Sequence, residues 1–96
     1  MELLDELKTV LDITWEDERT DQKLSGILSR AQSELEAYAG AEIDIQGETA
    51  ERQLLLDLCR YLYNNAAEDF ETNFRSKLIA LRARHLVEAM EDVADG

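Results

Sequence analysis

The sequence predicts an all-α protein that folds as a small single-domain bundle of about four helices. The chain of 96 residues has no proline and only four glycines, so the residues that interrupt helices are scarce. Apolar residues recur at spacings of three and four along almost the whole chain, which is the spacing of one helix face. A chain of this length holds one domain with one limited core.

The first helix is expected from Glu2 to Leu11, and an acidic connector, residues 12–21, follows it. The apolar stripe of this helix consists of Leu3, Leu4, Leu7, Val10 and Leu11. Trp15 is the largest apolar side chain of the connector. We expect Trp15 to be buried and to hold the connector against the first two helices, so that Trp15→Ala would cost about 3 to 5 kcal/mol.

The second helix is expected from Asp21 to Ala39. Thr20 or Asp21 would be its N-cap, and Gly40 fits the left-handed position at its C-terminus. Gly26 lies inside this helix, where the missing side chain would allow a close crossing with the first helix.

Residues 41–48 are expected to form a loop without a sheet, and the third helix begins near Thr49 and continues at least to Asn64. A helix that is apolar nearly all round is either the centre of a core or faces a neighbouring chain as well. Because so few helices in a chain of this length would not wrap it completely, the pattern indicates oligomerisation. The residues that make up this apolar surface are Leu54, Leu55, Leu56, Leu58, Cys59, Tyr61, Leu62 and Tyr63.

Two polar pairs are candidates for the next break, Asn64–Asn65 and Thr72–Asn73. We place the break at the second pair, with Asn73 as the N-cap of a fourth helix that starts at Phe74. The apolar residues of this helix fall on two stripes. The first stripe is expected to pack on the core and consists of Phe74, Leu78 and Leu81. The second is expected to be exposed in an isolated subunit and consists of Ile79, Leu86, Met90 and Val93.

Residues 1–84 are therefore expected to form the helical domain, and residues 85–96 a C-terminal helix extension or a partly mobile tail. Deleting residues 85–96 is expected to leave the bundle folded and to abolish attachment to a partner. The candidates for binding a partner lie at the end of the apolar third helix or along the second stripe, where apolar residues have a charged rim. They are Tyr63, Phe70, Ile79, Arg82, Arg84, Leu86 and Met90.

The charge of the chain excludes several kinds of partner. There are 22 acidic residues against 10 Lys and Arg, and the formal charge of −12 repels nucleic-acid phosphates and anionic membranes. Residues 1–73 carry the whole excess, whereas residues 74–96 hold four bases followed by four acids. No apolar run is long enough for a membrane helix, and the N-terminus is not expected to be a signal peptide. With a single cysteine and no internal disulfide, we expect a reducing, intracellular setting.

Residues that carry catalysis or bind metals are too few to form a site. Cys59, the only thiol, lies on the apolar third helix, where a buried and inert thiol is expected. His85, the only histidine, follows two arginines and is expected at the solvent or at an interface. The connector has acids spaced somewhat like a calcium loop, but Asp17 replaces the required glycine and Lys23 the bidentate glutamate. We therefore expect no enzyme activity, no cofactor and no metal.

Several of these patterns together resemble the head-tail connector proteins of long-tailed bacteriophages. In the first half, the resemblance lies in Leu7 and Leu11-Asp-Ile-Thr-Trp-Glu-Asp, Thr20-Asp-x-Lys-Leu24, and Ala31 with Tyr38-Ala-Gly40. In the second half, it lies in Gln53-Leu-Leu-Leu56, Cys59-Arg-Tyr61, Asn64-Asn-Ala66, Asn73-Phe74, Leu78 and Leu81-Arg82. These are packing and capping patterns, and they cover residues 3–84.

The resemblance implies a ring of about a dozen copies joined head to tail, which docks below the portal of the capsid, extends the DNA channel and receives the next tail adaptor. DNA would pass through without specific binding, because an acidic inner wall repels phosphates. The expected location is the head-tail junction of a virion assembled in the cytoplasm of a bacterial host. Composition alone leaves a second possibility open, an acidic DNA mimic that inhibits a basic enzyme and acts as a monomer or dimer.

Overall fold

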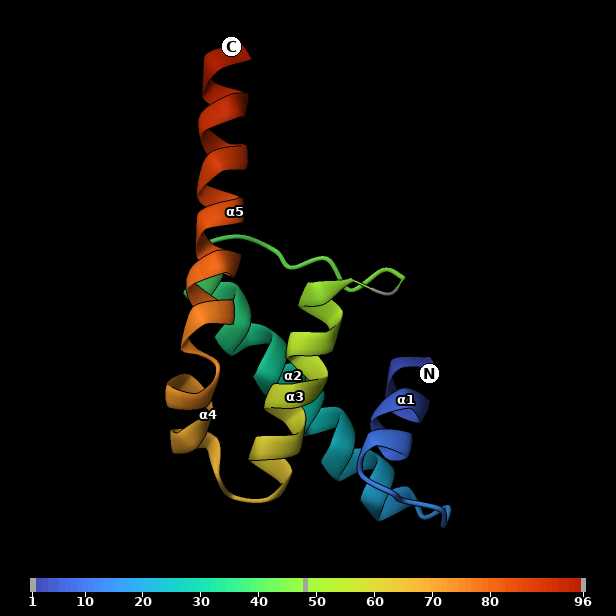
Figure 1. Ribbon diagram of the computed structural model, residues 1–96. Helices are drawn as coiled ribbons and strands as arrows, with labels where there is room; N and C mark the ends of the chain where they lie inside the picture. Colours follow the sequence, from blue (N-terminus) through green and yellow to red (C-terminus); the bar gives the residue numbers. More distant parts are fainter. Residues whose placement is uncertain (1, 48, 96) are drawn as a thin grey trace.

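The fold is all-α, as the sequence predicts. The computed structural model describes residues 2–47 and 49–95, and the side chains of residues 3–47 and 49–90. These residues contain no strand. The fold has five helices instead of about four, because residues 64–74 contain two breaks rather than one. The helices, labelled in Figure 1, are α1 (Glu2–Val10), α2 (Glu18–Ala39), α3 (Ala50–Tyr63), α4 (Ala67–Asn73) and α5 (Arg75–Asp95).

Helices α1 and α2 end at residues that tolerate a left-handed backbone. Asp12, with φ of 59°, follows α1, and the N–H of Ile13 donates to the carbonyl of Lys8 at 2.8 Å. Gly40, with φ of 74°, ends α2, and its N–H donates to the carbonyl of Glu36. The predicted role of Gly40 is therefore confirmed.

Trp15 is exposed, so the prediction that it holds the connector between α1 and α2 is wrong. Its side chain is 52% exposed, and its indole N–H donates to the hydroxyl oxygen of Thr20 at 3.3 Å. The hydroxyl of Thr20 in turn donates to Asp17 Oδ2 at 3.0 Å. Ile13 is buried and anchors the connector instead. Helix α2 begins at Glu18, with Asp17 at the N-cap position, which is before both expected caps, Thr20 and Asp21.

Helix α1 packs against α2 and α3 without a close approach at Gly26. A side-chain carbon added at Gly26 would meet no neighbour within 4 Å, so the predicted close crossing is wrong. Leu7 is the fully buried anchor of α1. The guanidinium of Arg52 also ties α1 to α3, because its Nε donates to Glu6 Oε2 at 3.0 Å.

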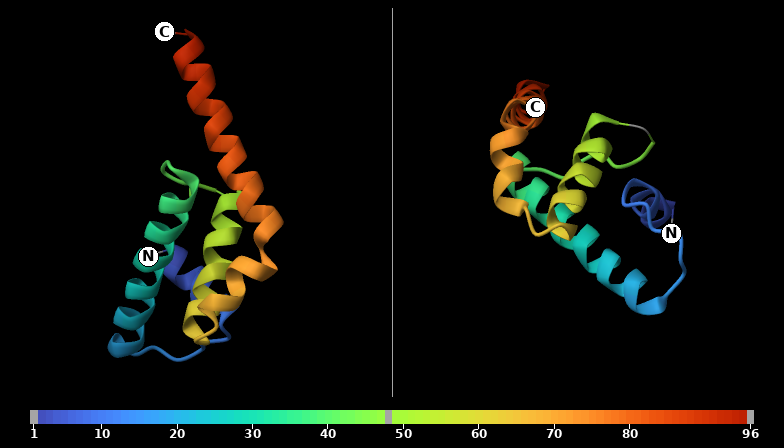
Figure 2. Two further views of the ribbon diagram at one scale, coloured as in Figure 1. Left: turned by 90° about the vertical axis from the view of Figure 1, so that its left-hand side faces the viewer. Right: turned by 60° about the horizontal axis from the view of Figure 1, so that its bottom comes forward.

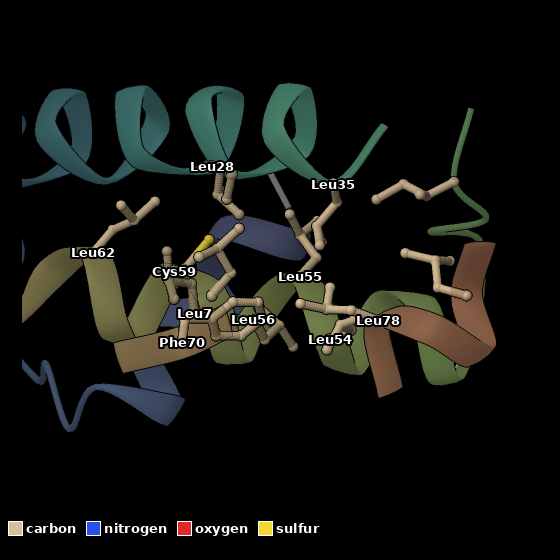
Figure 3. Packing of buried hydrophobic residues seen from close by; sticks show 14 of the residues in the cluster. Leu7, Leu28, Leu35, Leu54, Leu55, Leu56, Cys59, Leu62, Phe70 and Leu78 are labelled. Atoms are coloured by element: carbon tan, nitrogen blue, oxygen red, sulfur yellow. The ribbon is translucent and has the colours of Figure 1, made fainter. Parts of the chain in front are cut away.

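Helix α3 lies at the centre of the core. It begins where the sequence predicts, because the side chain of Thr49 accepts a hydrogen bond from the N–H of Arg52. Helices α1, α2 and α4 pack against it, and Figure 3 shows Leu28 and Leu35 of α2 pointing toward it. Its apolar side chains are covered within one chain, so the need to cover α3 no longer indicates oligomerisation. Those buried are Leu54, Leu55, Leu56, Leu58, Cys59 and Leu62.

The first of the two breaks falls at Asn64–Asn65, the candidate pair at which no break was predicted. Asn65 has a left-handed φ of 57°, and the N–H of Ala66 donates to the carbonyl of Tyr61, which ends α3 and starts a separate short helix α4. This helix folds back and stacks the ring of Phe70 on that of Phe74, with centroids 4.6 Å apart. Its last residue, Asn73, does not cap α5 as expected. Its side-chain amide instead donates to the Tyr61 hydroxyl at 3.1 Å.

Helix α5 extends beyond the rest of the molecule. Its 21 residues span about 31 Å at the rise of an α-helix. The first half packs against α2 and α4, and the second half continues past the other helices, as Figures 1 and 2 show. The overall dimensions of 50 × 27 × 18 Å reflect this extension.

Candidate protein-binding surface

Helix α5 carries an apolar face that stays largely exposed among the described residues. Four large apolar side chains of α5 are more than half exposed. Residues 79, 86 and 90 are spaced by seven and four, so they lie on one face of the helix. We call this surface the α5 apolar face, and it consists of Ile79 (56% exposed), Leu86 (60%), Val87 (51%) and Met90 (64%).

The sequence predicts most of this face correctly. Ile79, Leu86 and Met90 are exposed as expected, whereas the side chain of Val93 lies outside the described residues. Val87 was missed because it does not share the seven-and-four spacing. It follows Leu86 directly, about 100° around the helix, and therefore widens the face.

The opposite side of α5 joins the core. Leu78 and Leu81 are buried, and Phe74 just before the helix is half-buried, which confirms the predicted core stripe. The two stripes of α5 therefore face different ways, one toward the core and one toward the solvent.

A polar cluster fixes α5 to α3 near the middle of α5. Glu51 of α3 is almost completely buried and accepts three contacts. The N–H of Asp44 donates to Glu51 Oε1 at 2.8 Å, and His85 Nε2 lies 3.0 Å from the same oxygen. An Nη atom of Arg84 donates to Glu51 Oε2 at 3.3 Å. This cluster, the Glu51 anchor, holds the last hydrogen bonds to another element that the described side chains of α5 make.

The electrostatics of the Glu51 anchor favour its charged form. Burial by itself would raise the pKa of the Glu51 carboxyl, but the Asp44 N–H, His85 and Arg84 outweigh burial and lower that pKa below its usual value. His85 is therefore a partly buried residue of the anchor, and the sequence-based expectation that it could lie at the solvent is wrong. Arg84, a predicted partner-binding residue, uses its guanidinium within the chain, although about half of its side chain is exposed.

Exposed bases lie along the first half of α5, and two of them, Arg75 and Arg82, flank the α5 apolar face. Within the described residues, Arg75, Lys77 and Arg82 have no carboxylate within 4.0 Å, and all three are exposed. Arg75 and Arg82 are seven residues apart and lie on the same side of the helix. Lys77 lies over the ring of Phe74, with 5.5 Å from Nζ to the centroid. The sequence from 75 to 87 contains no acid, so this part of an acidic protein is locally basic.

The structure separates the other two predicted contact residues from this surface. Phe70 is buried in the aromatic cluster of α4 and is not available to a partner in this conformation. The prediction that Phe70 contacts a partner assumes that α3 continues past Asn64, but α3 ends at Tyr63. Tyr63 is half-buried at the end of α3, and Nζ of Lys23 lies 5.1 Å from the centre of its ring.

A shallow groove lies between α2 and α4, with a volume of about 360 Å³. Its floor is made of buried core residues, among them Leu35, Leu58 and Phe70. Three exposed carboxylates stand around it, and its lining contains no basic residue. They are Glu34, Glu68 and Glu71. The groove therefore combines an acidic rim with an apolar floor.

The single thiol is not part of any of these surfaces. Cys59 is fully buried on α3, and burial raises its pKa to about 12. Among the described residues, no three His, Cys, Asp or Glu side chains lie close enough together to hold a metal ion. None of the helices in that part of the chain combines the length and the apolar composition that a membrane crossing requires.

Comparison with known proteins adds no relative from which a function can be transferred. No protein-family model, no characterised protein and no solved structure matches the chain. The functional argument therefore depends on the surfaces themselves, above all on α5.

Proposed function

We propose that this chain is a structural subunit of a bacteriophage head-tail connector, a ring that docks below the portal and extends the DNA channel. The observation that carries the proposal is the α5 apolar face, which projects beyond the helical body and has a basic flank. The resemblance of residues 3–84 to connector proteins supplies the kind of assembly.

The α5 apolar face has the composition of a docking surface. Stable interfaces have an apolar centre and a charged rim, and a helix that presents residues at spacings of three, four and seven is a common way to fill a partner's groove. Four large apolar side chains exposed together have no role in the fold of the subunit, because the opposite side of α5 supplies its core contacts. A role in assembly accounts for them.

The net charge suits a protein that DNA passes without binding. A formal charge of −12 repels phosphates, so an inner wall built from such subunits would let the genome slide. A DNA mimic would also be acidic, but it would bind its target through carboxylates. The α5 apolar face and its unpaired bases have no part in that kind of binding, and they favour the connector over the mimic.

The test compares the full chain with a variant that lacks residues 86–96. The deletion starts at 86 rather than 85 because His85 belongs to the Glu51 anchor. We expect the full chain to form rings in negative-stain electron micrographs, alone or on the portal protein of the same genome. The truncated chain should keep its cooperative unfolding and form no rings.

A matched control introduces a charge elsewhere on the surface. Ala37→Glu alters an exposed position of α2 and should leave ring formation unchanged, whereas Leu86→Glu should abolish it. Rings formed equally well by the truncated chain would contradict the proposal. So would a full chain that stays monomeric with the portal and instead binds a basic nucleic-acid enzyme tightly, which is the behaviour of a mimic.

A further inference from the structure

The connector between α1 and α2 presents a further exposed apolar residue, Trp15, which does not belong to the core. Trp15 is 52% exposed, and the one hydrogen bond of its indole is the local one to Thr20. Tryptophan is among the residues most enriched at the energetic centres of protein interfaces. A half-exposed tryptophan that does not anchor its own loop is therefore a candidate contact residue.

The surroundings of Trp15 are acidic, whereas those of the α5 apolar face are basic. The exposed acids next to Trp15 are Asp12, Glu16, Asp17 and Glu18, against one exposed base, Arg19. The exposed bases beside the α5 apolar face are Arg75 and Arg82, and neither has a carboxylate within 4.0 Å among the described residues. Each surface thus has an apolar centre, and their rims carry opposite charges, which is the arrangement that complementary interfaces show.

The two surfaces lie at opposite ends of the molecule. Figure 1 shows the connector between α1 and α2 at the lower right and the free end of α5 at the top left, and both views of Figure 2 also separate them. One chain therefore does not bring its own Trp15 to its own α5 apolar face. A contact between them joins two copies, and each copy can use both of its surfaces at once.

We infer that copies of this chain join head to tail, with Trp15 of one copy seated on the α5 apolar face of the next. The inference rests on the proposed function and names the partner of the α5 apolar face as a second copy of the chain. A contact between two different surfaces repeats from copy to copy, so it produces a ring where the rotation closes and a filament where it does not.

Two other arrangements of the α5 apolar face bury no tryptophan. A parallel pair of α5 helices brings Arg75 and Arg82 of both copies together, and like charges repel. An antiparallel pair sets these arginines against the acids that follow residue 87, but it leaves Trp15 exposed. The groove between α2 and α4 has an acidic rim but no exposed aromatic residue to fill an interface, because Phe70 forms its buried floor. Both alternatives are separate outcomes of the test.

The test uses cross-linking, which captures weak contacts between the intact chains. Cysteines are introduced beside each surface, as Glu16→Cys next to Trp15 and Ala83→Cys between Ile79 and Leu86. Cys59 does not compete, because it is fully buried and its pKa is about 12. With a short bismaleimide, the chain carrying both substitutions should give a ladder at multiples of 11.0 kDa. Each chain with only one of the two substitutions should stay at 11.0 kDa.

Three results would overturn the inference. Rapid dimerisation of the Ala83→Cys chain alone would mean that α5 pairs with α5. A ladder of equal rate from a Glu71→Cys, Ala83→Cys chain would place the α2–α4 groove in the contact instead. A doubly substituted chain that cross-links no faster than the single-cysteine chains would show that the two surfaces do not meet.

A mixing experiment gives an independent measurement. Trp15→Ala and Leu86→Glu each remove one of the two surfaces, so each variant alone should lose self-association by about tenfold or more, the loss expected for a residue at the centre of an interface. When the two variants are mixed, the intact connector of the Leu86→Glu chain should bind the intact α5 of the Trp15→Ala chain. The product should be a heterodimer that grows no further. A mixture that associates no better than either variant alone would contradict the head-to-tail contact.

The outcomes separate this inference from the proposed function. Rings that form without the cross-link between positions 16 and 83 would leave the connector proposal standing and reject the contact. A head-to-tail ladder in a chain that never binds a portal would support the contact and reject the connector.

Discussion

The two halves of α5 share one continuous helix, but they relate differently to the rest of the molecule. Residues 75–85 are held by Leu78 and Leu81 in the core and by the Glu51 anchor. Residues 86–90 expose Leu86, Val87 and Met90, each by more than half. We call residues 75–85 the anchored half and residues 86–95 the free half.

The difference shows which part of the chain serves folding and which part is left for a partner. Most of the stability of a helix in a protein comes from packing, and an isolated helix of this length is marginal in water. The free half has good helix formers and no glycine or proline before position 96, so it continues the helix begun by the anchored half. The free half is therefore helical because the anchored half provides the helix that it continues, and contact with a partner would stabilise it further.

The largest expected difference between the halves concerns two leucines. Leu81 has no exposed surface, so Leu81→Ala should lower the free energy of unfolding by about 2 to 5 kcal/mol. Leu86→Ala removes the same atoms from an exposed position and should change it by less than about 0.5 kcal/mol. Urea denaturation of both variants measures the contrast. Equal losses would mean that the free half is part of the folding core.

The next effect concerns the Glu51 anchor. Glu51→Gln removes the charge that meets Arg84 and His85 and should cost about 1 to 3 kcal/mol near neutral pH. Because the folded state lowers the pKa of Glu51, this contribution is complete above the usual carboxyl pKa and is lost as the pH falls through the lowered value. The difference between native and variant stability should therefore shrink below about pH 4.5. A difference that grew on acidification would contradict the direction of the shift.

A smaller effect separates local from global stability. Ala80 and Ala89 are both exposed on α5, one in each half, and replacing either with glycine costs about 1 kcal/mol of local helix stability. Ala80→Gly should lower the global stability by that amount. Ala89→Gly should leave it unchanged but speed amide hydrogen exchange in the free half by about fivefold. If Ala89→Gly lowered the global stability as well, the two halves would unfold together.

The smallest expected effect concerns Trp15, the exposed tryptophan of the connector. Trp15→Ala should change the free energy of unfolding of the isolated subunit by about 0.5 kcal/mol or less, because Ile13 anchors the connector. Thermal unfolding at low protein concentration, where copies do not associate, is the measurement. A loss of several kcal/mol in the free energy of unfolding would mean that Trp15 stabilises the core, and it would remove the basis for its role in a contact.

Local signals in the sequence predict much of this fold. Thr49 and Gly40 mark helix ends because capping and left-handed positions depend on the residue itself. The two stripes of α5 follow from helical spacing, which assigns Leu78 and Leu81 to the core and leaves Leu86 outside. The exposed face was therefore predictable, because the alternative would require a core larger than so short a chain can form.

The rest depends on contacts between distant residues. The Glu51 anchor joins residues 34 positions apart, and no spacing in the sequence indicates that pair. Phe70 was assigned to the surface because the break at Asn65 uses a left-handed asparagine, a weaker signal than glycine. Trp15 was assigned to the core because size favours burial, yet the smaller Ile13 takes that place.

The Glu51 anchor lies close to the midpoint of α5, so the free half can change its direction relative to the anchored half. Beyond it the free half is a lever arm of about 15 Å, so a tilt of about 10° at the anchor moves the tip by about 3 Å. When the helix bends just beyond the anchor, Leu78 and Leu81 keep their places in the core. A subunit built in this way can meet neighbours whose spacing varies slightly around an assembly, while its folded body stays the same.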